Sequence, residues 1–183
     1  MLEAIPQDVI AARSAAVWRQ LYDTAEYRAA DVIMIYLPLS TEVDAQQLAQ
    51  RAWADLKRVA APRVSWDQRR MFPVEISSLT ARFEEDSYGV REATEGMPVP
   101  IAEVDLVVVP GLAYDGKGNR LGRGRGFYDR FLVHPDFHGV SCGVAFEEQV
   151  LDDVPVAAND VPIHMLVTDA RVRHFVAAKP GKP

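Results

Sequence analysis

The stretch from Val107 to Leu132, VVVPGLAYDGKGNRLGRGRGFYDRFL, decides how this chain folds. Its β-branched start, bounded by Pro110-Gly111, indicates a buried strand, and the apolar spacing of residues 127–132 predicts the first turns of a helix. A glycine-rich loop with three arginines lies between them. Backbone N–H groups that enter a helix beside guanidinium groups bind phosphate well. The stretch therefore predicts a phosphate-binding loop between a strand and a helix.

Size and charge limit the kind of protein. The chain has 183 residues and a formal net charge of −6. This length fits one domain over residues 1–183, with residues 175–183 as a frayed tail. An acidic chain argues against nucleic-acid binding, which needs a broad basic face, so the arginines favour a small anion. We expect a monomeric, cytoplasmic enzyme with no membrane segment, because no apolar run approaches the ~20 residues of a membrane helix.

Apolar runs that alternate with helical periodicity predict an α/β fold. Helices are expected over residues 8–22 and 45–56. Strands are expected at 32–37, 59–64, 104–109, 140–146 and 163–169, with a possible further strand at 171–176 and an edge strand at 70–76. The predicted architecture has three layers: a mostly parallel, Rossmann-like central sheet with helices on both faces.

Ligands of such sheets bind where the parallel strands end. In this chain those positions are residues 38–42, 110–126 and 146–149. The glycine spacing there fits neither a dinucleotide fingerprint nor a P-loop. A flexible turn is one interpretation of the glycines. A phosphate-binding loop is the other. Three arginines within six residues favour phosphate binding, because such charges repel unless an anion lies among them.

Several single residues allow two interpretations each. Asp129 is either a carboxylate stabilised at a helix start or a Mg²⁺ ligand, with Asp160 as a second carboxylate. Glu42 either supports the start of a helix or accepts hydrogen bonds from a polar heterocycle. His134 and His138 have i, i+4 spacing, but Pro135 makes a helical metal pair doubtful. Cys142 lies in an apolar segment and is expected to be buried.

Residues 109–115 (VPGLAYD) and 118–129 (GNRLGRGRGFYD) closely resemble the signature of 5-formyltetrahydrofolate cyclo-ligases, also called 5,10-methenyltetrahydrofolate synthetases. Similar segments elsewhere are Tyr36-Leu37-Pro38-Leu39, Glu42-Val43-Asp44, Tyr88-Gly89-Val90-x-Glu92 (with Ala93 in place of Pro), residues 143–149 and residues 155–162. The resemblance spans Ser14 to Asp169. It implies a fold similar to the CoA-transferase and ribose-phosphate-isomerase type.

The resemblance also implies an activity. These enzymes use Mg-ATP to phosphorylate the formyl oxygen of 5-formyltetrahydrofolate, after which N10 attacks the activated carbon. The partners implied are therefore ATP as co-substrate and a reduced folate. ATP would be held by Arg120, Leu121, Gly122, Arg123, Gly124, Arg125, Gly126, Phe127 and Tyr128. Folate would be held by Leu37, Glu42, Arg123, Gly124, Arg125, Gly126 and Phe127. Mg²⁺ would be held by Asp129 and Asp160, and the catalytic residues implied are Arg123, Arg125 and Tyr128.

The N-terminal segment departs from the family pattern. Family members usually begin with a basic helix bearing a Lys-x-x-x-Arg pattern that contributes to the nucleotide site. Aligned on Glu42, this chain starts too late to contain it, and no cation precedes Arg13. Three expectations follow: the chain continues upstream, Arg13 or Arg19 substitutes, or ATP binds poorly. The last makes a non-catalytic folate- or nucleotide-binding module the alternative function, and a sugar-phosphate or CoA enzyme is a third, weaker one.

Overall fold

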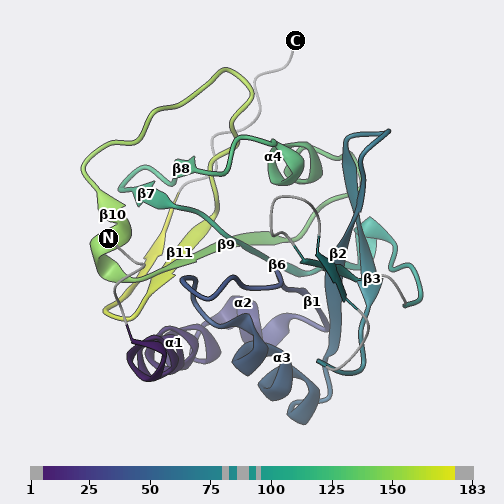
Figure 1. The fold of residues 1–183 in the computed structure, drawn as a ribbon, viewed down its shortest axis with the longest axis horizontal. Helices are drawn as coiled ribbons and strands as arrows, with labels where there is room; N and C mark the ends of the chain where they lie inside the picture. Colours follow the sequence, from purple (N-terminus) through teal and green to yellow (C-terminus); the bar gives the residue numbers. More distant parts are fainter. Residues whose placement is uncertain (1–5, 80–82, 86–90, 94–95, 176–183) are drawn as a thin grey trace.

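A computed structural model describes residues 6–79, 83–85, 91–93 and 96–175 (Figure 1). Its main sheet has seven strands in the order β12-β11-β9-β6-β1-β2-β3. Their bounds are β1 Val32–Met34, β2 Arg58–Ser65, β3 Arg70–Glu75, β6 Leu106–Val109, β9 Val140–Ala145, β11 Met165–Thr168 and β12 Val172–His174. The five inner strands run parallel, and β3 and β12 are antiparallel to their neighbours. The predicted mostly parallel sheet is confirmed, and so is the edge position of residues 70–76.

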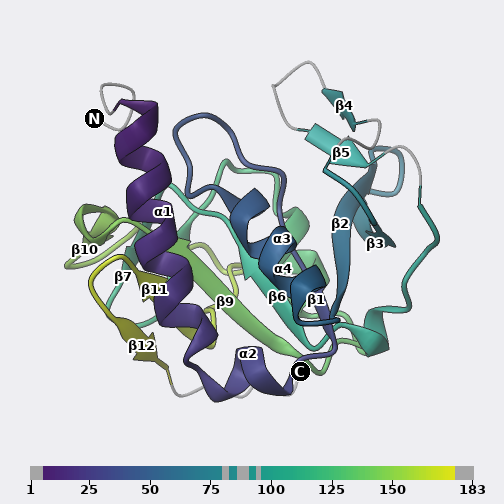
Figure 2. The ribbon, with the colours of Figure 1, turned by 90° about the horizontal axis from the view of Figure 1, so that it is seen from below.

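Helices cover both faces of this sheet (Figures 1 and 2). Three lie on one face: α1 Gln7–Tyr22, α2 Ala25–Ala29 and α3 Ala45–Ala54. The other face carries α4 Phe127–Leu132 and a small sheet of β7 Ala113–Asp115, β8 Arg120–Leu121 and β10 Val150–Leu151. Each face has its own apolar core, with Trp18 and Leu48 buried on the first and Tyr114 and Phe131 on the second. The three-layer α/β prediction is therefore confirmed.

The remaining short elements are β4 Phe83–Glu85 with β5 Arg91–Ala93, and two 3₁₀ turns, η2 Ile101–Glu103 and η3 Glu147–Gln149. Residues 86–90, which include the start of the Tyr88–Glu92 segment, lie outside the described residues, as does the predicted tail from residue 176. In the described part of the chain, none of the helices has the length and apolar character needed to span a membrane. Cys142 is fully buried, as predicted.

The glycine-rich loop is more ordered than its sequence suggests. It contains the β7–β8 hairpin, which was not predicted. Buried Asp115 closes this hairpin, because its carboxylate accepts hydrogen bonds from the backbone N–H groups of Lys117 (2.9 Å) and Asn119 (3.0 Å). The following helix has only six residues. Its macrodipole therefore adds little, and the arginines must supply most of the attraction for an anion.

Candidate functional site

A cleft of about 790 Å³ lies where the parallel strands end, and it collects every residue that the family resemblance implied for ATP, folate and Mg²⁺. Its lining includes Leu37, Glu42, Arg120, Leu121, Gly122, Arg123, Gly124, Arg125, Gly126, Phe127, Tyr128, Asp129 and Asp160. Tyr36, Leu39 and residues 155–157, which belong to the segments similar to those of cyclo-ligases, line it too. Four residues of the β2–β3 hairpin that no motif had indicated complete the walls: Pro62, Val64, Trp66 and Met71. The cleft thus joins parts of the chain that are far apart in sequence.

Arg120 is the most informative side chain of the cleft. Only 6% of it is exposed, and its Nη2 lies 3.1 Å from both carboxylate oxygens of Asp129. Its Nε and Nη1 are buried without a hydrogen-bond partner in the described structure. A buried N–H group without a partner is costly, and more so when it is charged. Two such groups beside a cleft indicate that an anionic ligand completes their hydrogen bonding.

Gly111 makes room for this arginine. A Cβ atom at position 111 would lie 2.8 Å from Cγ of Arg120 and 2.8 Å from the hydroxyl oxygen of Tyr114. Tyr114 in turn donates its hydroxyl hydrogen to the carbonyl of Val109, 2.7 Å away. The Pro110-Gly111 end of strand β6 is therefore shaped to seat the Arg120 side chain, and this explains why glycine occupies that position.

The two predicted metal ligands, Asp129 and Asp160, belong to segments far apart in sequence, and both line the cleft. Asp129 accepts hydrogen bonds from Arg120 and from the backbone N–H of Val161 at 3.1 Å. Asp160 accepts one from the backbone N–H of Ala157 at 2.7 Å. Among the described residues no group of three or more His, Cys, Asp or Glu side chains could hold a metal. A Mg²⁺ ion here would take its other ligands from phosphate and water, as Mg²⁺ commonly does.

Glu42 faces the cleft. Its Oε2 accepts a hydrogen bond from the backbone N–H of Leu39 (3.0 Å), and its Oε1 lies 3.1 Å from Nη2 of Arg123. Helix α3 is capped by Asp44, whose Oδ1 accepts from the backbone N–H of Gln46 at 3.0 Å. The capping interpretation of Glu42 is therefore wrong. The Arg123–Glu42 ion pair links two walls of the cleft.

An aromatic wall stands opposite the arginine loop. Trp66 contacts Phe127 edge to face at 5.3 Å, and the guanidinium of Arg125 lies 5.7 Å from the Trp66 ring centre. Flat ligands stack well on such a wall. Sequence reasoning missed Trp66 because it lies in a hairpin turn outside every motif. The only available signal was an exposed tryptophan beside a predicted edge strand.

Tyr128 lies near the base of the cleft, within reach of the Arg120 guanidinium at 5.9 Å. Burial is the main cause that raises the pKa of its hydroxyl above the ordinary value, and the nearby carboxylate of Glu42 adds to this, while Arg120 opposes it. The hydroxyl therefore stays protonated near neutral pH. It can donate a hydrogen bond to a ligand but cannot act as an anionic base.

Residues 146–149 were expected at the ligand site, but none of them lines the cleft. Gln149 instead supports the cleft from behind, since its Nε2 donates to the carbonyls of Gly111 (3.3 Å) and Leu112 (3.2 Å). Phe146 is fully buried. This segment therefore positions the end of strand β6 and does not contact the ligand space.

The expectation that Arg13 or Arg19 replaces the missing basic segment is wrong for this structure. Arg13 pairs with Asp169 at 2.6 Å and with Glu148, and its guanidinium stacks over the ring of Phe146. Arg19 lines a second cavity, together with residues of α2 and α3. Neither side chain lines the cleft. Both side chains therefore extend from α1 to neighbouring segments other than the glycine loop.

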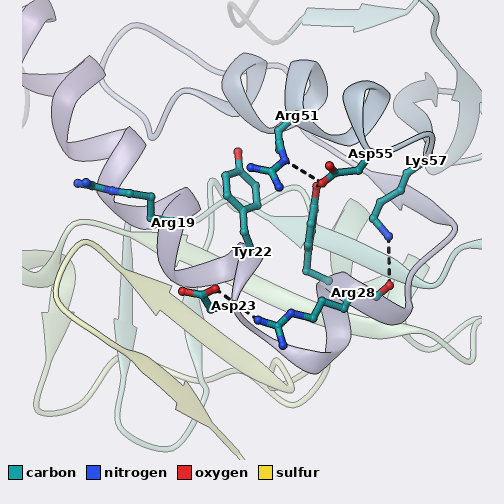
Figure 3. Close-up of a pocket in the computed structure, with 8 residues that line it drawn as sticks. Arg19, Tyr22, Asp23, Arg28, Arg51, Asp55 and Lys57 are labelled. Atoms are coloured by element: carbon teal, nitrogen blue, oxygen red, sulfur yellow. Dashed lines mark hydrogen bonds and ion pairs between the residues drawn. The ribbon is translucent and has the colours of Figure 1, made fainter.

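The second cavity, of about 550 Å³, lies among the carboxyl ends of α1, α2 and α3 (Figure 3). Most of its charged groups have partners within the protein. Arg51 Nε lies 2.8 Å from the Asp55 carboxylate, and Arg28 pairs with Asp23. Lys57 Nζ donates a hydrogen bond to the carbonyl of Ala30 at 2.6 Å. Cations at the carboxyl ends of helices stabilise the helix dipoles. This cavity is therefore a joint between three helices, and we assign it no ligand.

The Glu147 network gives a pH prediction. Glu147 accepts hydrogen bonds from Arg173 Nη2 (2.6 Å) and from the hydroxyl of Thr168 (2.6 Å). The Arg173 bond is the largest of the causes that lower the pKa of Glu147 from 4.5 to about 2. A carboxyl whose pKa is lower in the folded state stabilises the fold fully above its unfolded pKa. That contribution is lost as the pH falls through the folded pKa.

We therefore expect Glu147→Gln to lower the free energy of unfolding by about 1–2 kcal/mol at pH 7, a value reduced for solvent screening of a partly exposed side chain. The difference from wild type should shrink between about pH 4.5 and pH 2. Denaturant unfolding of both proteins at pH 7, 4 and 2.5 measures it. An equal difference at all three values would show that packing, and not the carboxylate charge, carries the contribution.

The fold and the site define the class: an α/β protein with a mostly parallel sheet and a cleft lined by glycines and three arginines at its strand ends. The model of the 5-formyltetrahydrofolate cyclo-ligase family matches residues 1–169, and the chain belongs to that family.

Individual relatives agree with this. The mouse 5-formyltetrahydrofolate cyclo-ligase is 28% identical over 148 residues, which are 75% of this chain and 73% of the mouse chain. The Escherichia coli K12 protein of that name is 27% identical over 151 residues, 78% of this chain and 80% of its own. The solved 5,10-methenyltetrahydrofolate synthetase of Aquifex aeolicus superposes with a TM-score of 0.79 at 28% identity, covering 98% of this chain and 89% of the other.

Proposed function

We propose that this protein is an ATP-dependent ligase that cyclises 5-formyltetrahydrofolate to 5,10-methenyltetrahydrofolate, with release of ADP and phosphate. Membership of the family supports this proposal. The structural observation that carries it is Arg120, a buried guanidinium with two unpaired nitrogens beside the cleft. A phosphoryl group offers the oxygen atoms that these N–H groups lack, and guanidinium groups bind phosphate with paired hydrogen bonds.

The proposed reaction has two steps. First the formyl oxygen attacks the γ-phosphorus of ATP, forming an O–P bond while the bond to the ADP oxygen breaks. Then N10 attacks the formyl carbon and the C–O bond breaks, so that inorganic phosphate leaves with the oxygen and the bonding electron pair. The N10 proton passes to the departing phosphate or to water. Phosphorylation converts a poor leaving group into a good one. In both steps negative charge develops on phosphoryl oxygens, and fixed cations stabilise such charge strongly.

We assign the phosphate role to the arginine loop. Arg120 is already oriented by Asp129, so it stabilises the transferring group without reorganising. Arg123 and Arg125 lie on the same loop and line the same cleft. Leu121, the glycines and Phe127 bring the backbone close to the nucleotide. Tyr128, protonated because it is buried, would donate a hydrogen bond.

The folate would lie between the loop and the opposite wall. Glu42 is a half-buried carboxylate whose oxygens can accept hydrogen bonds from the amino and ring N–H groups of a pterin. Leu37 and Trp66 supply apolar surface beside it. If a pterin binds to Glu42, the ion pair between Arg123 and Glu42 must break, or the carboxylate must contact both groups at once. We therefore propose that the ion pair opens when substrates enter.

Asp129 and Asp160 are the residues that would hold Mg²⁺. When bound with ATP, the ion would neutralise phosphate charge and fix the orientation of the phosphates. Two carboxylates on one wall of the cleft suit this limited role, with phosphate and water as the other ligands. We further propose that the protein is a monomeric, single-domain, cytoplasmic enzyme that binds neither nucleic acid nor membrane, in line with its net charge of −6.

Incubation with Mg-ATP and 5-formyltetrahydrofolate, followed by the absorbance of the methenyl product, tests the function directly. No product at high enzyme concentration would contradict it. A non-catalytic binding module is the second candidate, because no cation of α1 lines the cleft within the described residues. Calorimetry with ATP and folate titrated separately decides between them, since the ligase must bind both.

Arg123→Ala should lower kcat/KM by about 10- to 100-fold, because a charge-assisted bond to phosphate contributes ~1.5–3 kcal/mol. The free energy of unfolding should change by less than about 0.5 kcal/mol, since the Arg123 side chain is half exposed and its ion pair contributes little. Arg28→Ala is the matched control: this arginine is also exposed and also paired with a carboxylate, but it lies in the second cavity. Equal loss of folding and activity in Arg123→Ala would show that the loop residue is structural.

A further inference from the structure

Arg130 joins three segments at the rim of the cleft without lining it. This exposed arginine on α4 donates from Nε to the carbonyl of Arg69 (2.5 Å) and from Nη2 to the carbonyl of Arg125 (2.8 Å). Its guanidinium also lies 5.2 Å from the centre of the Phe127 ring. Arg69 belongs to the turn between β2 and β3, and Arg125 to the glycine loop. One side chain therefore ties the two opposite walls of the cleft together.

One of the two tied backbones is strained. Arg69 has a φ of 52°, a left-handed conformation that is unfavourable for a residue other than glycine and that persists where the surroundings hold it. Gly126, the residue after Arg125, has a φ of 66°, which glycine adopts without strain. A Cβ atom at position 126 would lie 2.9 Å from Nη1 of Arg130, so this turn is shaped to accept the guanidinium. The guanidinium of Arg130 lies against the turn at Gly126 and donates a hydrogen bond to the carbonyl of Arg69.

What the tie holds in place is the aromatic wall facing the arginines. Trp66 lies in the hairpin and contacts Phe127 at 5.3 Å, while Arg125 lies over the Trp66 ring. Helix α4 and the hairpin thus meet through Trp66, Phe127 and Arg130. If Arg130 releases the Arg69 carbonyl, the hairpin can separate from the loop, and the distance between Trp66 and Arg125 is no longer fixed.

We propose that Arg130 is a positioning residue for the ligase reaction: it holds the glycine/arginine loop at a set distance from the Trp66 wall. The inference rests on the proposed function. Two of its nitrogens bond to protein carbonyls, so its role differs from that of Arg120, whose unpaired nitrogens await a ligand. The planar fork of arginine donates in two directions from one rigid group, which the single ammonium of lysine does not reproduce.

Three variants test this. Arg130→Met keeps an apolar side chain over Phe127 and removes both donors. We expect kcat to fall about 10-fold or more, with KM for Mg-ATP changed far less, because ligands still bind but reach the productive arrangement less often. The kcat of Arg130→Lys should lie between the values of Arg130→Met and wild type. Arg51→Met is the matched control, since Arg51 also combines a side-chain bond, to Asp55, with stacking on an aromatic ring, but it lies in the second cavity.

Limited proteolysis supplies a readout independent of activity. Trypsin should cut Arg130→Met faster than wild type after Arg69 and after Arg125, the two residues whose carbonyls lose their donor. The melting temperature should stay within about 4 °C of wild type, the shift expected for ~1 kcal/mol in a domain of this size. Unchanged kcat, or an unchanged cleavage pattern, would overturn the inference. A fall in kcat that follows general unfolding, or that occurs equally in Arg51→Met, would also overturn it.

The two proposals can fail separately. If wild type forms no methenyl product, the ligase function fails, and cleavage after Arg69 and Arg125 still reports whether Arg130 ties loop to hairpin. If wild type is active and Arg130→Met is equally active, only the role of Arg130 fails.

Discussion

Arg120→Met is expected to lower kcat/KM by at least about 100-fold, because a preorganised group that stabilises transition-state charge contributes ~2.7–4 kcal/mol. The substitution removes a guanidinium that is 6% exposed and has two nitrogens without partners. Methionine matches the aliphatic part of the arginine side chain but leaves the space of the guanidinium group empty. ATP affinity measured by calorimetry should fall as well, which separates this effect from a disturbance of the folate wall.

Stability is the confounding effect for this variant, since Asp129 would lose its cation. The double variant Arg120→Met/Asp129→Asn controls for this loss in unfolding measurements alone, because the neutral amide leaves no unpaired buried charge. Its activity is not compared, since Asp129 is also a proposed Mg²⁺ ligand. Arg120→Lys keeps the charge and loses the fork, and we expect it to recover part of the ATP affinity. If Arg120→Met binds ATP as tightly as wild type, the phosphate role belongs to other residues and the central argument for the function fails.

Gly139→Ala is expected to destabilise the fold by about 3 kcal/mol, near the upper range for overpacking of a close-packed site. Gly139 directly precedes strand β9, where an added Cβ would lie 2.2 Å from the carbonyl oxygen of Val104 and 2.7 Å from that of Asp105. Both atoms belong to the backbone leading into β6, so they cannot move aside as a flexible side chain can. Denaturant unfolding at fixed pH measures the change.

Gly116→Ala is the control for the glycine experiment. A Cβ atom at position 116 meets nothing within 4 Å, and φ there is not in the left-handed region. Its stability should equal or slightly exceed that of wild type, since alanine restricts the unfolded chain. An equal loss in both variants would show that loss of glycine flexibility, and not the steric contact with Val104, is the cause.

Much of the fold followed from the periodicity of the chain. Apolar runs such as residues 106–109 and 165–167 become buried parallel strands, because both faces of the sheet are covered. The strand order could not be predicted, since β6 lies between β1 and β9 through pairings of residues far apart in sequence. The β7–β8 hairpin was missed because its order comes from Asp115, whose carboxylate closes a turn that otherwise looks like a flexible glycine loop.

The site divides in a similar way. The arginine loop could be recognised because its charge and glycines lie together in the sequence. The β2–β3 hairpin could not, because Trp66 lies outside every motif and reaches the cleft only through the tertiary fold. Arg13 illustrates the opposite error. Its charge suggested a phosphate ligand, but two acidic partners, Glu148 and Asp169, lie closer to it than the cleft does.

The cleft walls come from residues 36–42, 62–71, 110–129 and 155–160. A ligand that contacts all four segments holds together strands β1, β2 and β6 and the loop before β11. Such a ligand binds only the folded state, so it should raise the melting temperature of the entire chain by an amount set by its concentration relative to Kd. It follows that a chain cut before residue 155 lacks one wall, and that substrate can stabilise the fold only when all four segments are present.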